Sequence, residues 1–207
     1  MSADKKMIIG VTGKTKSGKS EACRAMKRPG VKVIDVDKFA HALYKKNMPL
    51  WHKLVKLYGK QILDTTGEVD RKILRNIAFK DGESYSKFTQ MVYPVLCTAL
   101  KSKIQNLKSK IVVLDMAVLF ETGFYKKADY IIFIKTDEKL RNKRVANMRE
   151  RVFLNKAAAF QEVFSAFKKV ALSDFVICNN GTKMRLEKVV MDVLNKIIPK
   201  AGQKRKM

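Results

Sequence analysis

Five short apolar runs constrain the fold of this chain more than any other feature of its sequence. They are rich in β-branched residues, and segments of helical character separate them. The runs are Met7–Thr12, Val31–Asp37, Ile111–Met116, Tyr130–Lys135 and Asp174–Cys178. Apolar strands that alternate with helices favour an α/β fold in which helices cover both faces of a parallel sheet. We therefore predict a mostly parallel sheet of about five strands, with ligands beyond the carboxyl ends of the strands.

A glycine-rich loop, GKTKSGKS, follows the first of these runs. It fits the P-loop pattern, in which two glycines enclose four residues and precede a lysine and a serine. The glycines let backbone amides face a phosphate, and the N-terminus of the next helix adds positive charge. The alternative is a glycine-rich turn with exposed lysines. We expect a nucleotide site of the P-loop NTPase type that is formed by Gly13, Lys14, Thr15, Lys16, Ser17, Gly18, Lys19, Ser20 and Glu21.

Aspartates stand at the ends of the second and third predicted strands. Asp37 is placed to accept or orient the proton of an acceptor hydroxyl group in phosphoryl transfer. Asp115 is placed to hold Mg²⁺ together with the Ser20 hydroxyl group. Asp35 is interpreted as a turn or helix-capping residue, because aspartate is common at helix N-caps.

The organisation of the chain is predicted to be a single domain, residues 1–207. Its core comprises 7–38 and 111–198, and a helical insertion at about 39–110 covers the substrate. A basic segment at about 141–170 is expected to form a lid, and a basic tail occupies 199–207.

The charge balance, with 44 Lys and Arg against 19 Asp and Glu, gives a net charge of +25. Such an excess favours polyanionic partners but does not choose among them. Nucleic acid stays open as a partner, although the sequence has no helix-turn-helix, RNP or zinc-finger signature. The separated cysteines Cys23, Cys97 and Cys178 indicate reduced thiols and a cytoplasmic location. We expect no signal peptide, no membrane span, and a monomer or a small homo-oligomer.

Several stretches taken together resemble the dephospho-coenzyme A kinase family in their order and spacing. They are IIGVTGKTKSGKS, VKVIDVDKFAHALY, IVVLDMAVLFETGFYKKADYIIFI and SDFVICNNG, and the resemblance extends from about Met7 to Ile198. It implies that ATP, with Mg²⁺, phosphorylates the 3′-hydroxyl of the ribose of dephospho-coenzyme A (dephospho-CoA). This reaction is the last step of coenzyme A (CoA) synthesis. The resemblance also implies a P-loop core, a helical substrate domain and a lid.

Site residues follow from the resemblance by position. Asp37 is similar to the family's proposed base, and Lys19 and Arg144 to its phosphate-binding lysine and its lid arginine. The acceptor side is implied to include Tyr93, Leu119, Phe120 and Glu121, and the loop near the adenine to include Asn180 and Gly181. Aromatic residues of the insertion are expected in the core, although some of them can line a cavity for the pantetheine arm. They are Trp51, Tyr58, Phe79 and Phe88.

The chain departs from the family pattern at several positions. Ala117 replaces a proline, Tyr93 replaces a histidine, and Lys14 and Lys16 replace glycines. The lid arginines also have a different spacing, Arg144-x4-Arg149. The alternatives that remain are a kinase similar to nucleoside monophosphate kinases, an ATP-dependent nucleic-acid-binding module, and a weakly active relative.

Overall fold

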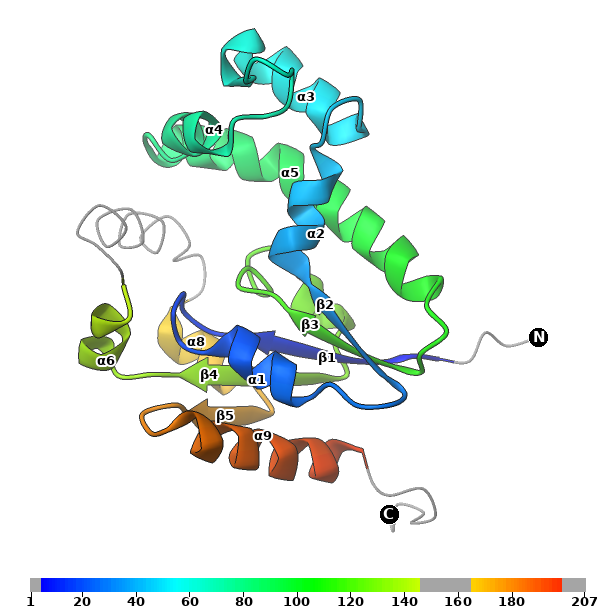
Figure 1. The fold of residues 1–207 in the computed structure, drawn as a ribbon, viewed down its shortest axis with the longest axis vertical. Helices are drawn as coiled ribbons and strands as arrows, with labels where there is room; N and C mark the ends of the chain where they lie inside the picture. Colours follow the sequence, from blue (N-terminus) through cyan, green and yellow to red (C-terminus); the bar gives the residue numbers. More distant parts are fainter. Residues whose placement is uncertain (1–4, 146–164, 199–207) are drawn as a thin grey trace.

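The computed structural model describes residues 5–145 and 165–198. Within these ranges five strands form one parallel sheet in the order β2-β3-β1-β4-β5, which confirms the predicted fold class (Figure 1). The strands are β1 (Met7–Thr12), β2 (Val31–Asp35), β3 (Ile111–Asp115), β4 (Tyr130–Lys135) and β5 (Phe175–Cys178). Most of the predicted lid, residues 146–164 with Arg149, lies outside the described residues. The tail 199–207 lies outside them as well.

Helices cover both faces of the sheet, because alternate strand residues belong to different hydrophobic clusters. Val113 packs in one cluster with α1 (Lys19–Ala25) and α9 (Lys183–Ile197). Its neighbour Val112 packs in another cluster, with the second half of α5 (Gly82–Gln105). Both valines are fully buried, so the apolar character of the runs reflects burial on two sides.

The second strand ends earlier than the sequence predicts. It stops at Asp35, and α2 (Val36–Leu43) begins directly after it. The Asp35 carboxylate accepts a hydrogen bond of 2.9 Å from the backbone nitrogen of Lys38 and so caps the helix. Asp37 therefore lies in the first turn of a helix and not at the end of a strand.

The segment between β2 and β3 is helical, as predicted, and rises away from the sheet from the carboxyl end of β2 (Figure 1). After α2 it contains α3 (Pro49–Tyr58), the short η1 (Lys60–Ile62), α4 (Arg71–Ala78) and α5. A hydrophobic cluster of its own includes Leu50, Leu54, Leu74 and Val92. Because α5 reaches from this cluster to the sheet, it connects the helical segment with the core.

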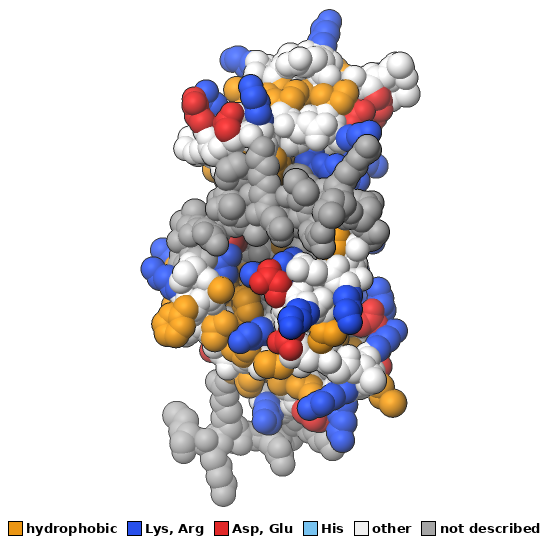
Figure 2. Space-filling model, turned by 90° about the vertical axis from the view of Figure 1, so that its left-hand side faces the viewer, with side chains coloured by type: hydrophobic (Ala, Val, Ile, Leu, Met, Phe, Trp, Pro, Cys, Tyr) orange, Lys and Arg blue, Asp and Glu red, His pale blue; other side chains and the backbone are white. Residues whose placement is uncertain are grey.

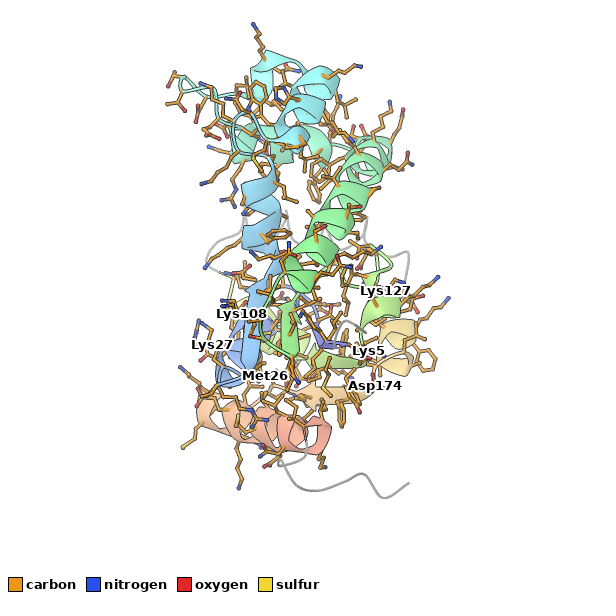
Figure 3. The ribbon with its side chains drawn as sticks, turned by 90° about the vertical axis from the view of Figure 1, so that its right-hand side faces the viewer. Lys5, Met26, Lys27, Lys108, Lys127 and Asp174 are labelled. Atoms are coloured by element: carbon orange, nitrogen blue, oxygen red, sulfur yellow. The ribbon has the colours of Figure 1, made fainter. Side chains whose placement is uncertain are left out.

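The opposite end of the sheet, where the strands begin, carries Lys5, Lys108, Lys127 and Asp174 (Figure 3). Asp129 accepts a hydrogen bond from the backbone nitrogen of Ile8, and Asp174 accepts one from that of Ile131, both at 2.8 Å. These carboxylates therefore satisfy backbone N–H groups of β1 and β4. Two short helices, α6 (Glu138–Lys143) and α8 (Ala166–Ala171), complete the part of the chain discussed below. Within residues 5–145 and 165–198, every helix is too short or too polar to cross a bilayer.

Candidate active site

The loop between β1 and α1 wraps closely against two neighbouring segments. Gly13 (φ 145°) and Gly18 (φ 97°) adopt backbone conformations that favour glycine. A Cβ atom on Gly13 would lie 2.3 Å from the carbonyl oxygen of Ile134, and one on Gly18 would lie 2.2 Å from Nδ2 of Asn179. Both glycines of the motif are therefore required by close packing. The backbone of Lys16 also adopts a left-handed conformation, with φ 64°, which is unusual for a lysine.

Lys19 lies buried at the centre of this loop, with 8% of its surface exposed. Its Nζ atom donates a hydrogen bond of 3.1 Å to the carbonyl oxygen of Lys14, inside the loop itself. Burial lowers the pKa of Lys19, while the nearby charges of Asp115 and Asp37 act in the opposite direction. This arrangement holds an ammonium group at the place where the motif binds phosphate.

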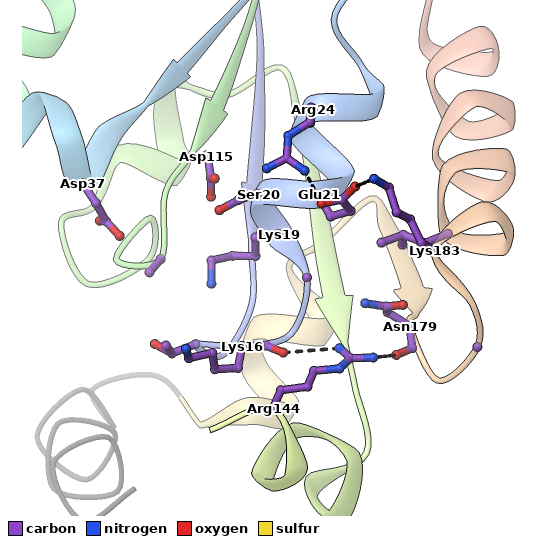
Figure 4. Close-up of a pocket in the computed structure, with 15 residues that line it drawn as sticks. Lys16, Lys19, Ser20, Glu21, Arg24, Asp37, Asp115, Arg144, Asn179 and Lys183 are labelled. Atoms are coloured by element: carbon purple, nitrogen blue, oxygen red, sulfur yellow. Dashed lines mark hydrogen bonds and ion pairs between the residues drawn. The ribbon is translucent and has the colours of Figure 1, made fainter. Parts of the chain in front are cut away.

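Asp37 and Asp115 face the same cavity as Lys19 (Figure 4). Burial raises the pKa of both carboxyl groups, and the charge of Lys19 opposes the rise in each case. The Ser20 side chain also forms a hydrogen bond with Asp115. A hydroxyl and a carboxylate side by side are hard oxygen donors of the kind that Mg²⁺ prefers, so these residues fit a magnesium site.

The cavity that these residues share has a volume of about 550 Å³. Figure 4 shows that it extends from Asp37 on one side to Asn179 and Lys183 on the other. The predicted residues that line it are Thr15, Lys16, Gly18, Lys19, Ser20, Glu21, Asp37, Asp115, Arg144 and Gly181. Other predicted residues do not line it: Ser17 is buried within the loop, and Lys14 lines a different cavity beside α6 and α8. The Asn180 side chain instead accepts a hydrogen bond from the backbone nitrogen of Asp137.

Asn179 is a site residue that the sequence reasoning missed. It is 6% exposed, and its Nδ2 atom donates a hydrogen bond of 2.8 Å to the carbonyl oxygen of Ser17. Thr136 donates to the same carbonyl oxygen at 2.9 Å. Arg144 donates to the carbonyl oxygens of Lys16 and Asn179, at 3.3 and 3.4 Å. These residues hold the loop from outside the motif; the position of Asn179, directly after a strand and before Asn180, was the available signal.

Glu21 forms ion pairs at the other end of the cavity, with Arg24 and Lys183 (Figure 4). The Lys183 Nζ atom lies 2.7 Å from Oε1 of Glu21. The hydrogen bond from Lys183 is the main cause that lowers the pKa of Glu21. The pair with Lys183 joins α1 to α9 at the rim of the cavity, whereas the pair with Arg24 lies within α1. The sequence reasoning missed both cations.

The residues predicted on the acceptor side are set back from this cavity. Leu119 and Phe120 are buried in the hydrophobic cluster between the sheet and α5. Glu121 is 4% exposed in its side chain and forms an ion pair with Lys169 of α8. The hydroxyl group of Tyr93 lies 2.9 Å from that of Tyr85 on the same helix, α5. The binding roles of these residues stay predictions, whereas Ala117, just before them, does line the cavity.

Comparison with known proteins adds to this geometry. Residues 7–184 match the family model described as dephospho-CoA kinase. A dephospho-CoA kinase from Aquifex aeolicus is 31% identical over 192 residues, which cover 91% of this chain and 96% of the relative.

Solved structures show the same fold. The crystal structure of TT1252 from Thermus thermophilus has a TM-score of 0.75 at 24% identity, covering 94% of this chain and 99% of that chain. A dephospho-CoA kinase from Campylobacter jejuni has a TM-score of 0.64 at 22% identity, with 92% and 96% covered. The fold, the phosphate loop with its facing acids, and the match over residues 7–184 lead to one conclusion: the chain belongs to the dephospho-CoA kinase family.

Proposed function

We propose that this chain transfers the γ-phosphoryl group of ATP to the 3′-hydroxyl of the ribose of dephospho-CoA, which completes CoA. The observation that carries the proposal is that the P-loop, Asp37 and Asp115 face one cavity in a chain whose residues 7–184 match this family. In this proposal the helices α2 to α5 hold the acceptor above the core. The free cysteines of the described residues fit the reducing cytoplasm.

The loop binds the triphosphate of ATP in this proposal. Its backbone amides and the N-terminus of α1 surround the phosphates, and Lys19 supplies a positive charge against the transferred group. Ser20 and Asp115 would hold Mg²⁺. When bound, Mg²⁺ neutralises negative charge on the phosphate oxygens. Arg144 keeps the loop in shape through its hydrogen bonds and lies close enough to the cavity to add a further cation.

Asp37 serves the acceptor. Its carboxylate accepts the proton of the 3′-hydroxyl group while the hydroxyl oxygen forms a bond to the γ-phosphorus. The bond from that phosphorus to the β–γ bridging oxygen breaks, and ADP leaves with the electron pair. The raised pKa of Asp37 makes it a stronger base than an ordinary exposed aspartate.

The alternative functions differ in the ligand that the protein would bind. A nucleoside monophosphate kinase would need only a nucleotide acceptor, and a nucleic-acid-binding module would need a continuous basic surface. Figure 2 shows one face of the molecule, on which acidic and apolar side chains lie between the Lys and Arg side chains. No observation on the described residues therefore favours nucleic acid over the small acceptor.

A coupled assay of ADP release tests the proposal. Purified protein with Mg²⁺ and ATP should release ADP when dephospho-CoA is present, and should release little with AMP or CMP. Release with nucleoside monophosphates and none with dephospho-CoA would assign the chain to the rival kinase class. A salt-dependent gel shift with RNA and DNA is the matching test of the binding-module alternative.

A further inference from the structure

A second cavity, of about 390 Å³, lies where the end of β4 meets α6 and α8. It shares no lining residue with the P-loop cavity, although Lys14 of the loop forms part of its wall. The proposed phosphoryl transfer assigns no ligand to this space. Its lining residues therefore show what else the protein can bind.

Arg141 is a buried cation in the wall of this cavity, with only 6% of its surface exposed. Its Nη2 atom forms an ion pair of 2.9 Å with Oε1 of Glu138, whose side chain is 68% exposed. The Nε atom is buried and has no hydrogen-bond partner within residues 5–145 and 165–198. A buried donor without a partner is costly in a folded protein, and so is a buried charge with incomplete pairing. Arg141 is therefore the group that gains most from an anion in the cavity.

The other charged residues of this cavity are exposed to solvent. Lys14 and Lys135 contribute two cations, and Asp137 and Glu138 contribute two acids. Solvent and salt screen exposed charges strongly, whereas a buried charge acts through a lower effective dielectric constant. The buried guanidinium group therefore decides the preference of the cavity, which is for an anion.

The remaining wall of the cavity is mostly apolar. Phe133 and Ile134 at the end of β4 are buried, and Val170 of α8 is half-buried. Phe167 of α8 also lines the cavity, although it is 83% exposed. Ligand sites commonly combine apolar and aromatic walls with a few polar groups that fix orientation. The cavity thus fits a small molecule with one anionic group and an apolar body.

Two lining residues connect this cavity with the phosphate loop. The Thr136 hydroxyl group donates a hydrogen bond of 2.9 Å to the carbonyl oxygen of Ser17. The carbonyl oxygen of Lys14 accepts the hydrogen bond from Nζ of Lys19. A ligand in the cavity therefore contacts residues that fix the shape of the loop. Its negative charge also opposes the charge of a triphosphate bound on the loop.

We propose that this cavity is a regulatory site for a small amphipathic carboxylate, which binds through Arg141 and weakens the binding of ATP. A carboxylate suits one guanidinium group because its two oxygens match paired N–H donors. The effect on ATP rests on the proposed function, whereas the binding of the carboxylate does not. Because coupling between two sites is reciprocal, ATP weakens the carboxylate by the same factor.

An NMR titration with octanoate tests the binding. Octanoate should bind at least about tenfold more tightly than acetate, which lacks the chain, and 1-octanol, which lacks the charge. Arg141→Met keeps a long buried side chain without the charge and should weaken octanoate about tenfold or more. Arg141→Lys should recover part of the loss, since it restores the charge without the paired donors.

Phe167→Ala tests the apolar part of the site without touching the buried arginine. Because Phe167 is exposed, the variant should keep its fold and its Kd for ATP, while octanoate binds several-fold more weakly. Leu57→Ala is the matched control. It removes an exposed apolar side chain from α3, outside this cavity, and should leave octanoate binding unchanged.

Calorimetry with Mg²⁺ and ATP, without an acceptor, measures the coupling to the loop. Octanoate should raise the Kd for ATP about fivefold or more, and the Kd should then reach a plateau, because both ligands can be bound at once. A direct competitor would instead raise the Kd without limit. Phe167→Ala should reduce the effect at a fixed octanoate concentration.

Several results would overturn the proposed site. Octanoate that binds no better than acetate, or equally well to folded Arg141→Met, would show that the cavity is not an anion site. If Arg141→Met does not fold, unchanged octanoate binding by Phe167→Ala leads to the same conclusion. A Kd for ATP that rises without a plateau would place octanoate in the P-loop cavity, and an unchanged Kd would overturn the regulatory role. A protein that binds octanoate but not ATP would instead overturn the proposed function.

Discussion

The nucleotide side and the acceptor side of this molecule are built in different ways. The phosphate loop is a continuous segment of eight residues, and its shape depends on glycines and on backbone carbonyl oxygens that Asn179, Thr136 and Arg144 hold. The cavity on the side of the helical segment instead collects side chains from several separate helices, α2, α4 and α5. A site made from backbone tolerates little change, whereas a site made from side chains can be altered one contact at a time.

The largest effect is expected at Lys19. Lys19→Ala removes the buried ammonium group of the phosphate loop, and kcat/KM should fall by about 10³-fold or more if it stabilises the transferred phosphoryl group as proposed. ADP release at saturating acceptor measures the loss, and a thermal melt checks that the loop remains folded. A decrease of less than about tenfold would show that the loop binds phosphate without this lysine.

The next largest effect is expected at Asp37. Asp37→Asn keeps the shape of the side chain but removes the proposed base, so kcat should fall by about 10²- to 10⁴-fold. The KM for ATP should change little, because Asp37 lies on α2, which is not part of the phosphate loop. A rise in the KM for ATP as large as the fall in kcat would show that Asp37 also serves ATP binding. The nucleotide side and the acceptor side would then not be separate.

The pH dependence of the rate is a further test of Asp37 as the base. A base works in its deprotonated form, and burial raises the pKa of Asp37, with Lys19 opposing. The rate should therefore fall, as the pH is lowered, at a higher pH than an ordinary aspartate would give. The profile of kcat/KM for the acceptor measures this limb, and Asp37→Asn should remove it. A limb that persists unchanged in the variant would belong to another group.

A smaller effect is expected at Asn179. Asn179→Ala removes the donor to the Ser17 carbonyl oxygen, which should destabilise the fold by about 1–3 kcal/mol and raise the KM for ATP several-fold. Denaturant unfolding and ATP kinetics measure the two effects. Asn195→Ala is the matched control, because Asn195 lies near the far end of α9 and accepts an exposed hydrogen bond from Arg28. Equal results for both variants would mean that the loop does not need this support.

The smallest effects are expected at the unusual lysines of the loop. Lys14→Gly and Lys16→Gly should change kcat/KM by less than about threefold. The side chain of Lys14 lines a different cavity, and glycine suits the left-handed backbone of Lys16. ADP release measures both. Losses as large as that of Lys19→Ala would place the extra charge of the loop in the mechanism.

The accuracy of the sequence predictions follows the same division. The bounds of β1 and β4 were predicted correctly, because buried parallel strands are continuous apolar runs. The second strand was predicted two residues too long, since alternation cannot distinguish the end of a strand from a helix that starts with a capping aspartate. The sequence analysis expected that aromatic residues such as Phe79 and Phe88 can line a cavity, but it could not place them beside His41 and Arg71. No local pattern joins these positions, and only the packing of three helices does.

The most direct test of the account is the position of the transferred phosphate. Protein incubated with Mg²⁺, ATP and dephospho-CoA should give a product whose phosphorus NMR spectrum shows one new monoester, on the ribose 3′-oxygen, in an amount equal to the ADP released. The same reaction with Asp37→Asn should give almost none. A new phosphate at any other oxygen, or ADP released without a phosphorylated acceptor, would contradict the claim that the loop and Asp37 act together on this hydroxyl group.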